Sequence, residues 1–247
     1  MQRYFTDQPI QLQEVFSVTG DTFHHLVRVM RAKENEQAEF VAANHQVFLG
    51  KIKSIDEKSA EILPVKQLEH AVEMPIEVTI ACGLSKGEKS EKIVQKGTEM
   101  GARHFIFLPT EFSVVKWPAA KIARKIDRLQ KIAVGAAEQS HRAYIPTISY
   151  CGSLRELMQW PGKFKIVAYE ESAKQGEHTQ LHHQIAQMQA NDEVLALFGP
   201  EGGLSTKEIK KLTDADFISV GLGPRILRAE TAPLYFLTAI SVFTEMR

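Results

Sequence analysis

The strongest constraint on the fold is the regular alternation of strand-like and helix-like segments from residue 74 onward. Short apolar runs bounded by turn residues are typical of buried strands, whereas apolar residues three and four apart are typical of helices. Strands that alternate with helices form a parallel sheet covered on both faces, so the sequence predicts an α/β fold here. The expected strands are residues 76–83, 104–110, 164–170, 193–199 and 217–223, and the expected helices are residues 86–100, 118–141, 179–190, 205–213 and 231–245.

The N-terminal part of the chain has a different pattern. Three β-rich runs, residues 38–43, 47–55 and 60–68, are separated by short turn segments, which indicates the hairpins of a small sheet or barrel. Residues 68–75 have no strong pattern and end in a proline, as a linker would. We therefore expect a small domain over residues 1–70 and a larger one over residues 74–247.

Two of the predicted helices allow a prediction of which side chains face the core. A helix over residues 19–33 follows a Thr/Asp cap, and the helix over residues 86–100 is expected to stop at Gly101. Apolar spacing then selects the inward positions of each helix. These are Phe23, Leu26, Val27 and Met30 in the first, and Ile93, Val94, Gly97 and Met100 in the second.

Composition limits the partners and the environment. Lys and Arg number 30, as do Asp and Glu, so the formal charge is zero and a nucleic acid would need a local basic patch. Two cysteines, Cys82 and Cys151, are too few for a disulfide framework and favour a reducing compartment. The start lacks a signal peptide, and the most apolar segment, about twelve residues near the end, is too short for a membrane span. We expect a cytoplasmic protein without a membrane partner.

Two expected strands end in glycine-rich segments, FGPEGG at residues 198–203 and GLGPR at residues 221–225. Ligands of open parallel sheets bind at such carboxyl ends. No lysine follows the first segment, as a P-loop requires, and Ile226 stands where a dinucleotide fingerprint needs a third glycine. Glycine instead lets the backbone approach a flat, uncharged group such as an adenosyl group. If the ligand also carries a positive sulfonium, the absence of a lysine is expected, because an ammonium would repel it.

Several long motifs carry a resemblance to a known family. FGPEGGLSTKEI, VGLGPRILRAETA, EKIVQKGTEMG and EQSHRAYIP, with FHHLVRVMR near the start, resemble the SPOUT (α/β-knot) RNA methyltransferases of the RsmE type, which methylate N3 of a uridine in 16S ribosomal RNA. The resemblance runs from the first residues to the last. It implies an RNA-binding PUA-like β-barrel over residues 1–70, a C-terminal domain with a trefoil knot, S-adenosylmethionine (SAM) as cofactor, a homodimer, and a role in ribosome biogenesis.

The resemblance also implies which residues form the cofactor site. SAM would lie against the two glycine-rich segments. The residues expected to bind it are Phe198, Gly199, Pro200, Gly202, Gly203, Val220, Gly221, Leu222, Gly223, Ile226 and Leu227.

Methylation of uridine N3 requires removal of a weakly acidic imide proton and stabilisation of the negative charge that results. Arg225 or Arg228 is expected to hold the uracil or the adjoining phosphate. Glu201 and Glu230 are both candidates for the proton acceptor, directly or through a water. Either carboxylate can instead satisfy loop N–H groups, and the sequence does not choose between these roles.

RNA is expected to contact a local basic face formed by His24, Arg28 and Arg31, joined by Arg3. Arg142 lies in a family motif, where it either reaches the substrate or anchors a helix end. Residues 116–131 form a second basic segment, with six Lys or Arg against one Asp, although a charged helix face of this kind is usually just solvated.

Other readings compete with the enzyme. A catalytically inactive RNA-binding protein of the same fold is opposed by the intact glycine-rich segments, and a nucleotide-dependent α/β enzyme is disfavoured by the missing phosphate fingerprints. The adjacent pairs His24 and His25, and His182 and His183, lack partners at ligand spacing, so no metal is expected. The last helix, with Pro233 in its first turn, is apolar nearly all round, which suits a core or a dimer interface.

Overall fold

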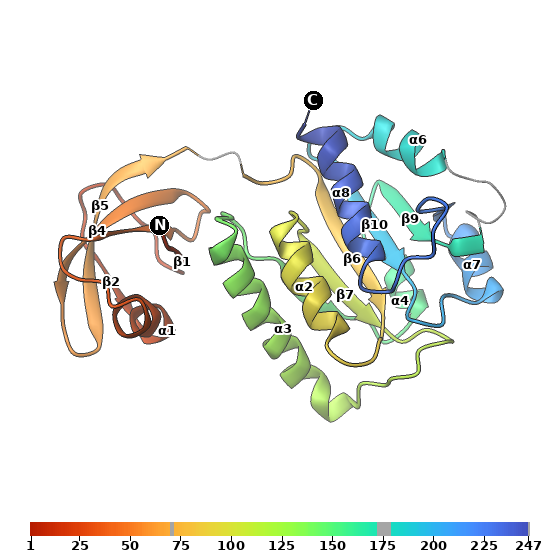
Figure 1. The fold of residues 1–247 in the computed structure, drawn as a ribbon, viewed down its shortest axis with the longest axis horizontal. Coiled ribbons are helices and arrows are strands. Elements are labelled where there is room, and N and C mark those ends of the chain that lie inside the picture. Colours follow the sequence, from red (N-terminus) through yellow and green to blue (C-terminus); the bar gives the residue numbers. More distant parts are fainter. Residues whose placement is uncertain (70–71, 172–178, 247) are drawn as a thin grey trace. The chain divides into compact units, whose positions relative to one another are not determined.

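The computed structural model describes residues 1–69, 72–171 and 179–246, which form two compact units (Figure 1). The first unit contains Met1–Glu73 together with Ala137–Tyr144, and the second contains Met74–Ala136 and Ile145–Arg247. Residues 137–144 thus belong to the N-terminal unit, although the division expected from the sequence placed them in the larger domain.

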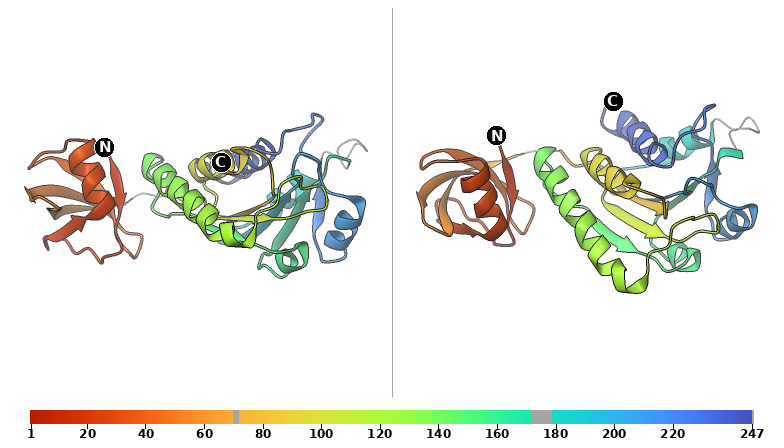
Figure 2. Two further views of the ribbon diagram at one scale, coloured as in Figure 1. Left: turned by 90° about the horizontal axis from the view of Figure 1, so that it is seen from below. Right: turned by 60° about the horizontal axis from the view of Figure 1, so that its bottom comes forward.

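The first unit is a curled five-stranded sheet with a helix packed against it (Figure 2). The three predicted β-rich runs form consecutive antiparallel strands, and β5 also pairs antiparallel with β2. The N-terminal strand β1 pairs parallel with β3, which places Arg3 directly opposite Glu39. In sheet order the strands are β1 (Arg3–Phe5), β3 (Gln37–Val41), β4 (Val47–Ile55), β5 (Ser59–Leu68) and β2 (Phe16–Thr19).

The helix of this unit starts as an α-helix, α1 (Gly20–Phe23), and continues as a π-helix, η1 (His24–Val29). Phe23 and Leu26 are buried in the core of the unit, as expected. Met30 was expected to face the core as well, but its side chain is 44% exposed. The wider turn of a π-helix changes the angular spacing of the side chains, so the 3.6-residue pattern stops predicting which residues point inward.

The second unit contains a six-stranded sheet in which every neighbouring pair is parallel. All five strands predicted for this part are present, and a sixth, β8, was missed because its sequence, TISY, contains no apolar run. In sheet order the strands are β11 (Ile218–Val220), β9 (Phe164–Ala168), β10 (Glu193–Phe198), β6 (Glu77–Gly83), β7 (His104–Leu108) and β8 (Thr147–Tyr150).

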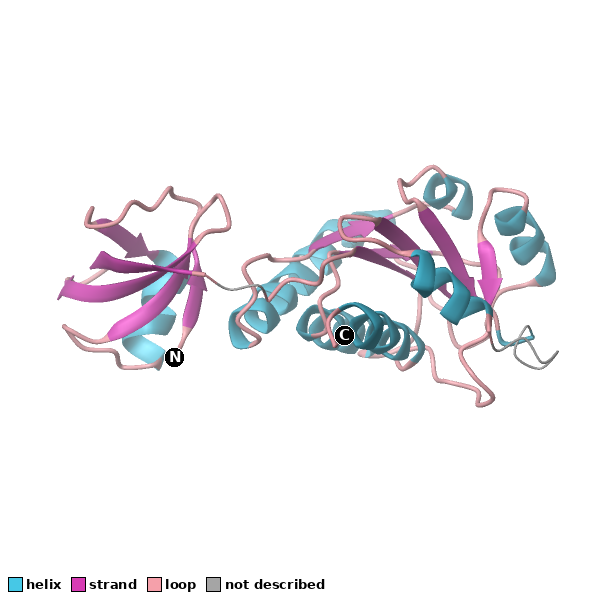
Figure 3. Ribbon diagram, turned by 90° about the horizontal axis from the view of Figure 1, so that it is seen from above, coloured by secondary structure: helices cyan, strands magenta, loops and turns pink. Residues whose placement is uncertain are grey.

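Helices cover both faces of this sheet (Figure 3). One face packs against α2 (Lys89–Glu99), α3 (Ala119–Gln139), α6 (Gln180–Gln187) and α8 (Ala232–Thr244), and the other packs against α4 (Leu154–Met158) and α7 (Thr206–Thr213). The short α4 was not predicted. In α2, Ile93, Val94 and Gly97 are buried as expected, but Met100 lies past the helix end and is 37% exposed. The predicted α/β fold is confirmed, and the trefoil knot stays a prediction.

The parallel arrangement brings the carboxyl ends of β6, β10, β9 and the outermost strand β11 to one edge of the sheet. Phe198 at the end of β10 lies opposite Cys82 of β6 and Ala168 of β9, and Val220 of β11 lies opposite Ala168. Both glycine-rich segments therefore leave the sheet at the same edge. Within the described ranges, no helix is both long enough and apolar enough to cross a membrane.

Candidate cofactor and substrate site

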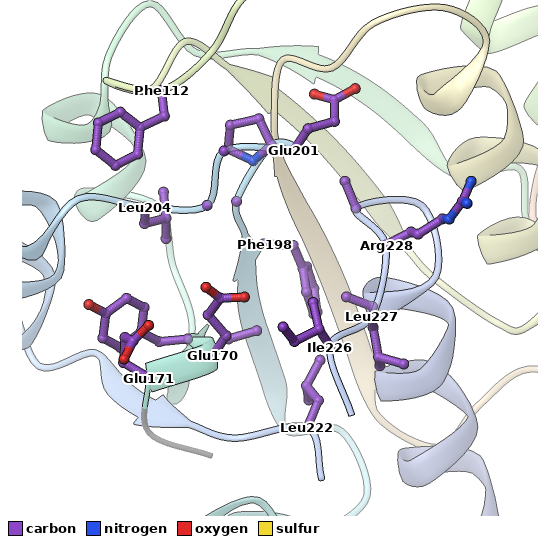
Figure 4. Close-up of a pocket in the computed structure, with 18 of the residues that line it drawn as sticks. Phe112, Glu170, Glu171, Phe198, Glu201, Leu204, Leu222, Ile226, Leu227 and Arg228 are labelled. Atoms are coloured by element: carbon purple, nitrogen blue, oxygen red, sulfur yellow. The ribbon is translucent and has the colours of Figure 1, made fainter. Parts of the chain in front are cut away.

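A cavity of about 1250 Å³ lies at this edge of the sheet (Figure 4). Its walls come from the segments that follow β9, β10 and β11, with Lys89 of α2 and residues 111–112 after β7. Typical small-molecule sites measure roughly 300–1,000 Å³. The cavity is therefore large enough for a nucleoside-sized cofactor and part of a second reactant.

The turn after β10 fits only with glycine. A Cβ on Gly199 would lie 2.8 Å from the carbonyl carbon of Gly203, and a Cβ on Gly202 would lie 2.9 Å from Cβ of Phe112. Gly203 itself has a φ of +73° and donates its N–H to the carbonyl of Pro200 at 2.9 Å. Backbone atoms thus form this wall of the cavity at a distance that no side chain would permit.

The second glycine-rich segment supplies an apolar wall. Figure 4 shows Leu222, Ile226 and Leu227 beside Phe198, which ends β10. Phe198 is fixed by an edge-to-face contact with Phe236 of α8, with the ring centres 5.6 Å apart. Ile226 is 74% exposed at the cavity, a position from which it can contact a ligand. This wall suits the flat apolar face of a nucleobase.

A lysine connects the two segments. Nζ of Lys89, in the first turn of α2, lies 3.0 Å from Oε1 of Glu201 and 3.3 Å from Oε2 of Glu230. Glu201 also accepts a hydrogen bond from the backbone N–H of Lys86 at 3.0 Å. One ammonium therefore ties both cofactor segments to the start of α2.

These contacts set the protonation states of all three groups. Burial alone would raise the pKa of Glu201 and of Glu230, but backbone hydrogen bonds and Lys89 outweigh it, so both pKa values fall below the ordinary value. The pKa of Lys89 is raised: burial alone would lower it, but the two carboxylates outweigh that effect. Both glutamates are thus ionised and the lysine protonated at neutral pH, which gives the cluster a net charge of −1.

This cluster corrects one expectation. The sequence predicted no ammonium beside the ligand, because none follows the first glycine-rich segment, yet Lys89 lines the cavity. Its charge is more than offset by Glu201 and Glu230, so a positive ligand is not repelled. Sequence spacing contained no signal for Lys89, since its partners lie more than a hundred residues further along the chain.

The structure brings most of the predicted cofactor residues together. All of them line the cavity except Val220 and Gly221, and Val220 is fully buried within β11. Arg225, Arg228 and Glu201 also line it, whereas Glu230 contacts it only through Lys89. Figure 4 shows Arg228 pointing away from Glu170 and Glu171. Lining residues that the sequence did not indicate include Glu111, Phe112, Tyr169, Glu170, Glu171 and Leu204.

Two residues predicted to contact RNA are buried instead. Arg3 is 1% exposed, and its guanidinium binds the carboxylate of Glu39 at 2.7 Å and donates to the carbonyl of His141. Arg142 is 3% exposed, and its Nε donates to Glu73 at 3.1 Å. Arg3 and Arg142 are therefore corrected to structural residues of the first unit, and Arg142 anchors the end of α3.

The remaining residues of the predicted basic face lie at the surface. His24, Arg28 and Arg31 are all exposed. Arg28 stacks over Phe23 at 5.7 Å from the ring centre and donates to the carbonyl of Glu57, which fixes its position. In the part of the chain that the structure describes, no three His, Cys, Asp or Glu side chains cluster as a metal site.

The chain thus combines an α/β unit that has a cofactor-sized cavity at the carboxyl edge of its sheet with a small β-sheet unit that precedes it in sequence. Residues 72–241 match the family model of an RNA methyltransferase domain, and residues 18–65 match that of an RNA methyltransferase PUA domain. The chain belongs to the RNA methyltransferase family. Its PUA domain lies within the curled sheet of the first unit, as the sequence predicted.

Individual relatives are similar over the full length. The chain is 43% identical over 253 residues to Ribosomal RNA small subunit methyltransferase E of Bacillus subtilis. The matched region covers 100% of this chain and 98% of the relative. The crystal structure of a hypothetical protein is similar at a TM-score of 0.92 and 38% identity, with 99% of both chains covered. A protein of Legionella pneumophila, solved with bound SAM, has a TM-score of 0.83 at 26% identity and covers 97% of this chain and 96% of its own.

Proposed function

We propose that this protein transfers the methyl group of SAM to N3 of a uridine in 16S ribosomal RNA. The observation that carries the proposal is the glycine-walled cavity at the carboxyl edge of the sheet, in a chain that is 43% identical to a small-subunit ribosomal RNA methyltransferase. The bound SAM of the Legionella relative supports the choice of cofactor. The uridine and its N3 atom rest on the family resemblance alone.

The residues of the cavity fit SAM in both polarity and charge. The apolar wall of Phe198, Leu222 and Leu227 would contact the adenine, while the backbone of the turn at residues 199–203 would approach it closely. The cluster of Lys89, Glu201 and Glu230 leaves a net negative charge nearby, as a sulfonium requires. SAM supplies a methyl group that its sulfonium activates for transfer.

On the substrate side, a cation must stabilise the uracil when its N3 proton is removed. The negative charge then spreads over the two carbonyl oxygens that flank N3. Arg225 is exposed and lines the cavity, so its guanidinium can donate to such an oxygen or to the adjoining phosphate. Arg228 lines the same cavity and lies near Glu230, and its charge helps to lower the pKa of Glu230.

Glu201 and Glu230 act in this proposal as positioning residues. A general base works best when its pKa lies near the working pH. Both carboxylates are held by Lys89 with their pKa values lowered, which makes them weak proton acceptors. Their hydrogen bonds instead fix the two segments that form the cofactor walls.

Replacement of Lys89 by methionine tests this role. The variant leaves two carboxylates close together without their shared cation, so the segments should separate and the Kd for SAM should rise at least tenfold. Lys92→Met, an exposed change on the same helix, serves as the control. Calorimetric titration with SAM gives both values, and equal affinities in the two variants would contradict the positioning role.

The glutamates themselves separate positioning from proton transfer. Glu201→Gln and Glu230→Gln retain hydrogen-bonding capacity, so kcat should stay within about tenfold of wild type while KM for SAM rises. A loss of about a thousandfold or more in kcat at unchanged SAM affinity would identify that glutamate as the base.

The function itself is tested by calorimetry with SAM and with NAD side by side, followed by methyl transfer to 16S RNA as a transcript and within small ribosomal subunits. We expect binding of SAM alone, and one methylated uridine that blocks base pairing at N3 during reverse transcription. Failure to bind SAM would favour the catalytically inactive RNA-binding alternative.

Two further parts of the proposal concern partners. His24, Arg28 and Arg31 would contact RNA phosphates, and charge reversal at Arg28 and Arg31 should then weaken binding and flatten its salt dependence. A homodimer is supported by the exposed apolar residues of α8, Tyr235 at 41% and Val242 at 47%, which share a helix face. An unchanged salt slope would rule out the RNA contact, and a monomer in sedimentation at micromolar concentration would rule out the homodimer.

A further inference from the structure

A second cavity, of about 530 Å³, lies in the methyltransferase unit on the other side of the first turn of α2. Its lining is basic, with five cationic side chains against the single carboxylate of Glu91, a net charge of +4. The cations come from the loop before α3 and from the first turns of that helix. They are Lys116, Lys121, Arg124, Lys125 and Arg128.

Most of this charge has no internal partner. Arg128 forms an ion pair with Glu91 at 2.9 Å, and Nζ of Lys125 lies 5.1 Å from the ring centre of Trp117. Among the described residues, no carboxylate pairs with Lys116, Lys121 or Arg124. Cations that converge on a concave surface repel one another and concentrate a positive potential there, which favours an anionic ligand.

The floor of the cavity is rigid. Trp117 is only 8% exposed, and it stacks on Tyr150 with ring centres 5.8 Å apart and an angle of 20° between the rings. It also contacts Phe107 of β7, with the ring centres 5.5 Å apart. The cation of Lys125 is held over this fixed ring, and Ser90 adds a hydroxyl group to the lining, whereas the hydroxyl of Ser85 donates to the carbonyl of Gly83. Basic side chains on a rigid base with a serine hydroxyl nearby match the groups that contact phosphate oxygens.

The position of this cavity relates it to the cofactor site. Lys89 lines the first cavity, whereas the next two residues of α2, Ser90 and Glu91, line the second. Both cavities therefore lie in the same unit and are separated by a single helical turn. A nucleic acid with one base in the first cavity would place a neighbouring part of its backbone near the second.

We infer that the cavity around Lys121 and Arg124 binds a backbone phosphate of the RNA whose target base enters the cofactor cavity. This inference rests on the proposed function. RNA is favoured over an acidic protein segment because the charge is concentrated beside the reaction site, where the substrate must pass. The chain as a whole has zero formal charge, so a local site of this kind is what positions a polyanion.

The test compares single charge reversals on one helix. Lys121→Glu and Arg124→Glu change the cavity, and Lys131→Glu makes the same change on the exposed surface of α3 outside it. Binding of a 16S RNA transcript is measured over a series of KCl concentrations. At physiological salt we expect an affinity about tenfold weaker for each cavity variant than for Lys131→Glu, and a salt slope smaller by about 1. SAM affinity should be unchanged, and KM for RNA should rise while kcat stays within about twofold.

Each outcome separates the two proposals. Cavity variants that bind RNA as tightly as Lys131→Glu would overturn the phosphate site, as would cavity variants that lose SAM binding. Wild-type protein that binds SAM but neither binds nor methylates the RNA would overturn the proposed function instead.

Discussion

Replacement of Gly199 by alanine is expected to weaken SAM binding by at least a hundredfold and to abolish measurable methyl transfer. The added methyl group would lie 2.8 Å from the carbonyl carbon of Gly203 and 3.0 Å from its Cα. Both are backbone atoms of the same tight turn, so no side-chain rotation can relieve the overlap. The turn must open, and the wall it forms moves away from the cofactor.

Gly135→Ala is the matched control for this change. Gly135 lies inside α3, and a Cβ there meets nothing within 4 Å. This variant should bind SAM like wild type and gain a few tenths to about 1 kcal/mol in stability from helix propensity. Calorimetric titration and urea unfolding of the two variants give the comparison. A Gly199→Ala protein with wild-type SAM affinity would show that the turn does not form the cofactor wall.

Replacement of Arg3 by methionine is expected to lower the free energy of unfolding of the N-terminal unit by about 3–5 kcal/mol, the usual effect of removing one partner of a buried ion pair. Arg3 contacts Glu39 through both Nε and a terminal nitrogen, and without it the one ionisable partner left to Glu39 among the described residues is His141. Lys53→Met, on the exposed side of β4, removes the same charge without breaking a buried pair.

Urea unfolding at pH 7 measures both variants, and the double variant Arg3→Met with Glu39→Met separates the causes. An apolar pair of similar size should recover much of the loss, because no buried charge is left without a partner. If Arg3→Met were as stable as Lys53→Met, the pair would contribute nothing to the fold.

The ion pair of Arg3 and Glu39 also makes the free energy of unfolding depend on pH. Burial alone would raise the pKa of Glu39, but Arg3 and His141 outweigh it and lower the folded-state pKa below 4.5. A carboxylate whose pKa is lower in the folded state contributes its full stabilisation at pH values above its unfolded-state pKa. This contribution is lost as the pH falls through the folded-state pKa. Wild-type stability should therefore decline below about pH 4.5 more steeply than that of the double variant.

The elements predicted well from the sequence are those whose signal is local. Strands β6, β7, β9, β10 and β11 lie in short, mostly apolar runs bounded by turn residues, and α3 repeats its apolar spacing over 21 residues. The edge strand β8, with the sequence TISY, contains no apolar run, and the helix α4 has only five residues, too few for a helical period to be recognised. The glycine-rich segments were located correctly because glycine marks a backbone constraint that does not depend on distant residues.

The errors concern long-range contacts. Arg3 was placed at an RNA surface because a charged side chain suggests exposure, and burial depends on partners elsewhere. For Arg142 the sequence left open substrate contact or the anchor of a helix end, and the structure shows the anchor. For Arg3 the partner lies directly across the sheet, since β1 and β3 pair with Arg3 opposite Glu39. Lys89 was missed for the same reason, because it joins two loops that are close only in the folded chain.

The N-terminal unit is discontinuous in the sequence, and this affects how the protein is made. Residues 137–144 complete it: His141 contacts Arg3 and Glu39, and Arg142 contacts Glu73. During translation, the strands of this unit leave the ribosome about seventy residues before these partners, so its buried ion pairs can form in full only later. We therefore expect the first unit to be completed only after residues 74–136 of the second unit have been translated, so a chain that stops before residue 137 would lack part of both units.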